Sequence, residues 1–123
     1  MNNLSALVWI ALGGAAGSVV RALVGMALRS SFPWATLLIN VTGSLLIGWV
    51  MTRFGSAEPA VAARMLNLLA VGFCGGFTTF STFSWQTLDQ MMKGQWGAAV
   101  ANVFLSVALS LLAVWLGFRL GRA

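Results

Sequence analysis

The sequence contains no histidine, only one cysteine and only two acidic residues, and these absences exclude several classes of function. With no imidazole, one thiol and two carboxylates, most metal sites and most pairs of a nucleophile with a general base cannot be assembled from side chains. The lone Cys74 also excludes an internal disulfide. We therefore expect no enzymatic function.

Charge of either sign is scarce: 7% of the 123 residues are charged and 59% are hydrophobic, with a mean hydropathy of +0.91. A soluble domain carries about a quarter charged residues, because its surface must meet water. This composition excludes an ordinary cytosolic domain and a disordered tail. It predicts an integral membrane protein whose surroundings are the lipid bilayer.

The net charge of +5 does not indicate a nucleic-acid partner. Apart from Arg21, the basic residues lie singly near the ends of apolar runs, whereas a phosphate-binding surface needs them clustered. Their positions are typical of anchors at a membrane interface. These residues are Arg29, Arg53, Arg64, Lys93, Arg119 and Arg122.

Four apolar segments are long enough to cross a bilayer as helices. None alternates with period two, as a barrel strand would, and the first segment lacks the basic start of a signal peptide. We predict one all-α membrane domain over residues 1–123. Its expected spans are 4–28, 33–52, 62–88 and 96–120.

The flanking charges set the orientation only weakly. With the N-terminus inside, four arginines face the cytoplasm and two basic residues face outward, a small excess for the positive-inside rule. Insertion in both orientations and a weakly biased inside N-terminus remain open alternatives.

The third segment carries an unusual run, residues 72–84, with three glycines and several threonines and serines. Glycine lowers helix propensity, and hydroxyls compete for backbone partners. One interpretation is a helix broken at its centre, as at ion sites of transporters. The alternative is an unbroken helix whose glycines allow close packing and whose hydroxyls bond their own carbonyls.

Within this run, Phe80 and Phe83 are three residues apart and share one face of a helix. The edge of an aromatic ring carries partial positive charge, so two edges directed into a narrow path would attract an anion. Ordinary core or lipid-facing packing is the alternative for such a pair.

Other spans supply neutral hydrogen-bond donors. Asn40 lies in an apolar stretch of the second span, and Asn102, Ser106 and Ser110 form one stripe on the fourth. Donors without acidic neighbours favour an anion over a cation, although interhelical hydrogen bonding is the simpler explanation. Arg21 is the only charge deep in a span; it serves either an aqueous vestibule or a structural bond to helix-end carbonyls.

Gly13 and Gly17 on the first span form a small-xxx-small pair that predicts close helix packing.

With these residues identified, the chain closely resembles the Fluc family of bacterial fluoride channels, also called the CrcB family. The resemblance rests on residues 13–21, on 36–43 and above all on 72–84, which ends Thr-Thr-Phe-Ser-Thr-Phe-Ser. One position departs from the family pattern: Gln86 stands where the family usually has glutamate, and a conductance different from that of the family is expected if that carboxylate takes part in fluoride entry or exit.

The resemblance implies an antiparallel, dual-topology homodimer in the bacterial inner membrane, with two pores that passively export cytoplasmic fluoride. It also implies a structural sodium ion at the dimer interface, bound by backbone carbonyls of Gly75 and Thr78 from both subunits. The fluoride pathway implied by the resemblance comprises Phe80, Phe83, Asn40, Ser81, Thr82, Asn102, Ser106 and Ser110.

Two other functions fit the same architecture less well. A small multidrug exporter needs a carboxylate within the membrane, whereas Glu58 and Asp89 both fall in connections. A non-transporting membrane subunit would use its glycines and hydroxyls for helix assembly alone, and ion flux through purified protein distinguishes it from a channel.

Overall fold

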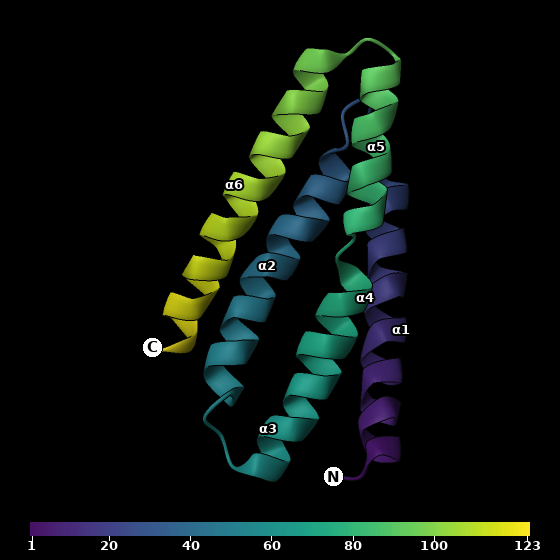
Figure 1. Ribbon diagram of the computed structural model, residues 1–123. Helices are drawn as coiled ribbons and strands as arrows, with labels where there is room; N and C mark the ends of the chain where they lie inside the picture. Colours follow the sequence, from purple (N-terminus) through teal and green to yellow (C-terminus); the bar gives the residue numbers. More distant parts are fainter.

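The computed structural model describes all 123 residues, and its regular structure is entirely helical. Its elements are α1 (Asn3–Ala27), α2 (Trp34–Phe54), α3 (Pro59–Met65), the π-helix η1 (Leu66–Cys74), α4 (Gly75–Phe77), α5 (Phe80–Met92) and α6 (Trp96–Gly121). Elements α3 to α5 follow one another as a single long span (Figure 1).

Four helical spans are long and apolar enough to cross a membrane: Asn3–Ala27, Trp34–Phe54, Pro59–Met92 and Trp96–Gly121. They run alternately up and down, so that both termini lie toward the lower end of Figure 1. The third span is longer than the segment 62–88 expected from hydropathy, because α3 begins at Pro59 and α5 continues to Met92.

Local chemistry fixes where these helices begin and turn. The Asn2 side chain accepts from the Ser5 amide at the start of α1, and Glu58 accepts from two amides at the start of α3. Such caps satisfy amides that the helix itself leaves unpaired. Gly94 adopts φ 73° in the turn before α6, a conformation that only glycine tolerates easily.

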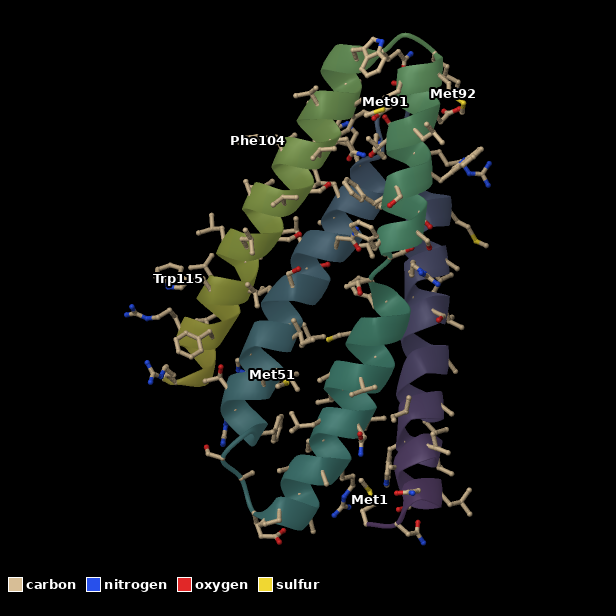
Figure 2. All side chains as sticks on the ribbon, in the orientation of Figure 1. Met1, Met51, Met91, Met92, Phe104 and Trp115 are labelled. Atoms are coloured by element: carbon tan, nitrogen blue, oxygen red, sulfur yellow. The ribbon has the colours of Figure 1, made fainter.

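Most large apolar side chains on the outside of the bundle are exposed, as Figure 2 shows for Phe104 and Trp115 on α6. Arg119 lies over the ring of Trp115 near the C-terminal end of α6, with 5.6 Å from its Cζ to the ring centroid. An apolar exterior with cationic and aromatic residues at the helix ends is suited to lipid. The chain is a multi-pass membrane protein.

Glycines bring the spans together in two close pairs. A Cβ at Gly13 or Gly17 of α1 would overlap the carbonyl oxygens of Leu68 or Phe73 in η1. The predicted small-xxx-small contact is therefore present. In the second pair, α2 against α6, the same applies at Gly48 and at Gly117, which the sequence pattern had not distinguished.

Gly17→Ala is expected to destabilise the fold by about 2 kcal/mol or more, because a methyl group there has backbone, not a movable side chain, in its way. Gly25→Ala is the matched control: no atom lies within 4 Å of its added Cβ. Thermal unfolding in detergent measures both variants. Equal melting temperatures for the two would contradict the close packing of α1 on η1.

Candidate functional site

The helical backbone of the third span is interrupted at two residues. Thr78 and Thr79 both adopt extended conformations, with ψ 157° and ψ 110°, between the end of α4 and the start of α5. Thr79 caps α5, since its Oγ1 accepts from the Thr82 amide. The chain leaves the helix for two residues at the centre of the span and then resumes it.

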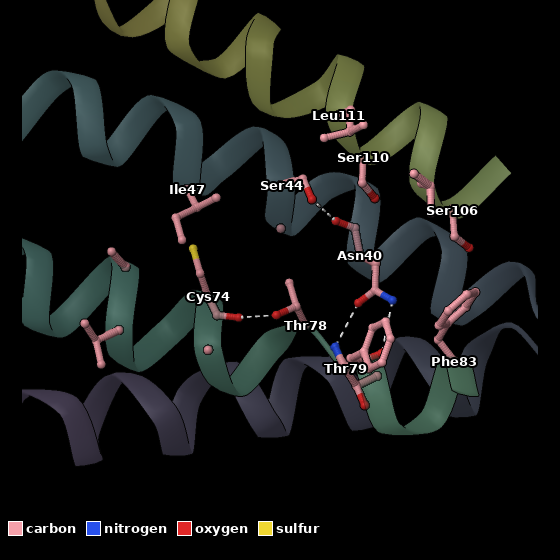
Figure 3. A pocket seen from close by; sticks show the side chains of 16 residues that line it. Asn40, Ser44, Ile47, Cys74, Thr78, Thr79, Phe83, Ser106, Ser110 and Leu111 are labelled. Carbon is pink, nitrogen blue, oxygen red and sulfur yellow. Dashed lines mark hydrogen bonds between the residues drawn. The ribbon is translucent and has the colours of Figure 1, made fainter. Parts of the chain in front are cut away.

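Asn40 on α2 holds this interruption from the side. Its Oδ1 accepts from the Thr79 amide at 2.8 Å, and its Nδ2 donates to the Thr79 carbonyl at 3.1 Å (Figure 3). One side-chain amide thus satisfies both backbone groups of a residue that has left the helix. The side-chain amide of Asn40, which lies within a membrane span, therefore has the backbone of Thr79 as its hydrogen-bond partner.

The interruption borders an open cavity of about 500 Å³ between α2, α6 and the third span (Figure 3). Its lining mixes hydroxyls, an amide and two aromatic rings with apolar walls, and it includes no charged residue. Seven of the predicted site residues line it: Asn40, Gly75, Thr78, Phe80, Phe83, Ser106 and Ser110.

The two predicted phenylalanines are neighbours in this cavity but differ in exposure. Their ring centroids lie 5.5 Å apart with planes tilted by 48°. The Phe83 side chain is buried at 9% exposure, whereas Phe80 is 79% exposed. Phe80 therefore presents most of its ring to whatever covers the open side of the cavity.

On α6 the predicted polar stripe divides. Ser106 and Ser110 line the cavity, whereas Asn102 is 1% exposed and lines none of the larger cavities. The Asn102 Nδ2 donates to the Thr87 hydroxyl at 2.9 Å, and its Oδ1 accepts from Ser106 at 3.4 Å. Asn102 thus links α6 to α5 by one hydrogen bond and bonds Ser106 on its own helix by another.

The start of α5 gathers three hydroxyl groups. Thr79 Oγ1 lies 3.1 Å from Thr82 Oγ1 and 3.3 Å from Ser81 Oγ. In the single chain, Ser81 and Thr82 are exposed. The first turn of a helix also carries partial positive charge from its unpaired amides, which favours an anion beside it.

Arg21 lies on the other side of the interruption. Its Nη1 donates to the Thr78 carbonyl at 3.4 Å, and its side chain lines a second cavity of about 530 Å³ together with Arg29, Thr82 and Gln86. Thr79 borders both cavities. Arg21 thus bonds the carbonyl of the residue that follows α4 and also lines a polar cavity.

Two carbonyls at the interruption have lost the amides that a continuous helix would supply. The Thr79 amide donates to Asn40 rather than to the Gly75 carbonyl four residues earlier. Likewise, the Thr82 amide donates to Thr79 Oγ1 rather than to the Thr78 carbonyl. Gly75 is also exposed, and nothing lies within 4 Å of where its Cβ would be.

Sequence reasoning missed Thr79 and Thr87, which are buried and hydrogen-bonded to the two predicted asparagines. No spacing rule pairs Asn40 with a residue 39 positions later. For Thr87 a weak signal existed, because it lies one helical turn after Phe83 on the same face.

Both cavities offer donors and no carboxylate. Glu58 caps α3, and Asp89 pairs with Lys93 at 2.6 Å near the end of α5. The polar and aromatic groups along the two cavities are hydroxyls, amides, aromatic rings and the guanidinium groups of Arg21 and Arg29. This arrangement can attract a small anion with many weak interactions, and it offers no carboxylate to bind a cation.

The sequence is similar to known proteins over nearly its whole length. The family model described as CrcB-like protein, Camphor Resistance (CrcB), matches residues 8–118. A protein of Opitutus terrae named fluoride-specific ion channel FluC is 46% identical, with 93% of this chain and 90% of the relative covered. A protein of the same name from Thermus thermophilus is 46% identical, with 93% of each chain covered.

Proposed function

Because the chain belongs to the CrcB-like family, a family of ion channels rather than enzymes, we propose that it is a fluoride channel. The observation that carries this proposal is the cavity beside Thr78 and Thr79, lined by hydroxyls, an amide and two aromatic rings without any carboxylate. Fluoride is small and strongly hydrated, so its path must replace water with many weak contacts and still release the ion.

The functional unit is an antiparallel homodimer with two pores. In the single chain the cavity is open, and Phe80 projects from it at 79% exposure among serine and threonine hydroxyls. Most of these hydroxyls are hydrogen-bonded within the chain, but the open side of the cavity still presents polar groups and the Phe80 ring at membrane depth, and a second copy can cover it. The weak charge bias of the connections is compatible with insertion of the two copies in opposite orientations.

The interruption of the third span is the centre of the pathway. Phe80 and Phe83 line the cavity there, and their ring edges would attract the ion; the hydroxyls of Ser106 and Ser110 follow along α6. Asn40 holds Thr79 with its oxygen and one N–H, and the second N–H of its Nδ2 can donate to the ion. The remaining predicted pathway residues are Ser81 and Thr82 at the start of α5 and Asn102 behind Ser106.

A sodium ion at the dimer interface would use the backbone carbonyls of Gly75 and Thr78. Both carbonyls lack their helical amide partners, and carbonyl oxygens are hard ligands suited to a hard cation. Arg21 uses one lone pair of the Thr78 oxygen and leaves the second free. The ion would be structural, since it satisfies backbone that has left the helix.

In the cell, the channel would lie in the bacterial inner membrane and release cytoplasmic fluoride down its gradient. Passive conduction needs no acid–base or redox group, and the cavity lining contains no carboxylate. A proton-coupled exporter of organic cations is disfavoured, because neither Glu58 nor Asp89 lines either of the two cavities.

The test is ion efflux from liposomes that contain the purified protein. We expect fluoride to leave rapidly on addition of a potassium ionophore, measured with a fluoride electrode, and chloride to stay inside. Equal fluoride and chloride efflux would contradict a selective path. No efflux of either ion from liposomes that contain dimeric protein would favour a non-transporting subunit.

A further inference from the structure

Two glutamines on α5, Gln86 and Gln90, carry buried amide atoms without any hydrogen-bond partner in the chain. These atoms are Gln86 Oε1 and both Oε1 and Nε2 of Gln90. The Gln90 side chain is only 4% exposed. Because buried amide groups in proteins are almost always paired, these atoms indicate partners that are not part of the chain.

Both glutamines line a small polar pocket of about 340 Å³ at the C-terminal end of α5. The pocket lies against the connection between α1 and α2, which contributes Ser30 and Ser31. Apart from Pro33, every residue of its lining is polar or charged. A polar space of this size holds several water molecules, each of which takes about 30 Å³ in the liquid.

The pocket adjoins the proposed pathway. It shares Ser30, Pro33 and Gln86 with the cavity that contains Arg21, and that cavity shares Thr79 with the one that contains the two phenylalanines. Asp89 and Lys93 both line the pocket and pair with each other, so together they bring no net charge to it. The amides of Gln86 and Gln90 are its buried groups without a hydrogen-bond partner.

We propose that Gln86 and Gln90 bind partly hydrated fluoride in this pocket, at an outer station of the pathway; the inference rests on the proposed fluoride channel. The Nε2 of Gln90 donates to the anion. The two Oε1 atoms accept from the water that stays with the ion. An amide pair satisfies both needs at once, whereas a full positive charge would hold the anion too firmly for transport.

The experiment compares fluoride efflux from liposomes with Gln90→Met, Gln90→Glu and the control Leu88→Met. Methionine keeps the length of Gln90 and removes its amide, and Leu88 on the same helix lines none of the larger cavities. We expect about tenfold slower efflux for Gln90→Met, as for the loss of one charge-assisted hydrogen bond. Gln90→Glu should be slower still, because its carboxylate repels the anion, and Leu88→Met should match the parent.

Parental efflux in both Gln90 variants would overturn the proposal. If Gln90→Met also had a higher melting temperature than the parent, the buried amide would be shown to lower the stability of the fold without serving conduction. If neither variant assembles, diffraction from the parent protein decides: ordered solvent on Nε2 and Oε1 of Gln90 supports the station, and a dry pocket refutes it. Absence of fluoride efflux from the parent would instead overturn the proposed function, and this inference with it.

Discussion

Phe83→Ile and Phe80→Ile are each expected to reduce fluoride efflux from liposomes by about tenfold to a hundredfold, while the protein stays dimeric. Isoleucine retains much of the apolar bulk but has no ring edge with partial positive charge. The two ring centroids lie 5.5 Å apart beside the interrupted backbone. The loss of either ring therefore removes an attraction for the anion at the centre of the proposed pathway. Efflux measured with a fluoride electrode gives the change directly.

Phe104→Ile provides the control, because Phe104 lies 69% exposed on the outer face of α6, away from the cavity beside Thr79 (Figure 2). It should conduct like the parent. Phe83 is buried, so its replacement also costs about 1 kcal/mol of packing. Size-exclusion chromatography therefore accompanies each flux measurement. Parental efflux through dimeric Phe80→Ile and Phe83→Ile would exclude ring edges as the basis of conduction.

The spans were predictable from the sequence because hydropathy and length alone decide what crosses a bilayer. The contact of α1 with η1 through Gly13 and Gly17 was predictable for a similar reason, since small residues four apart form one smooth strip on a helix. The π-helical geometry of Leu66–Cys74 was not predictable. This geometry depends on how the backbone of η1 packs against α1, and no residue pattern predicts that packing.

The candidate site was predictable as a set of residues but not as a set of partners. Residue types indicated that Asn40 needs a hydrogen-bond partner, yet only the fold shows that both groups of Thr79 supply it. The same holds for Asn102 and Thr87. Gln90 gave no signal at all, because a glutamine near a helix end is ordinarily solvated, and its burial depends on the neighbouring connection between α1 and α2.

Asn40→Asp tests the two hydrogen bonds by which Asn40 holds the interrupted backbone at Thr79. The carboxylate has the same shape as the amide and still accepts from the Thr79 amide, but it no longer donates to the Thr79 carbonyl. Two oxygens would then face each other where a hydrogen bond of 3.1 Å existed. We expect fluoride efflux to fall about a hundredfold or more, because the new negative charge repels the anion and the backbone at Thr79 shifts.

Three further variants and conditions separate these effects. Asn3→Asp adds the same charge at the exposed start of α1 and should conduct like the parent. Asn40→Leu removes the hydrogen bonds without adding charge and should lose stability as well as flux. In Asn40→Asp, lowering the pH protonates the carboxyl group, which restores a donor toward the Thr79 carbonyl and removes the charge, so efflux should partly recover. Parental efflux in folded Asn40→Asp at neutral pH would show that neither the backbone bond nor local charge controls conduction.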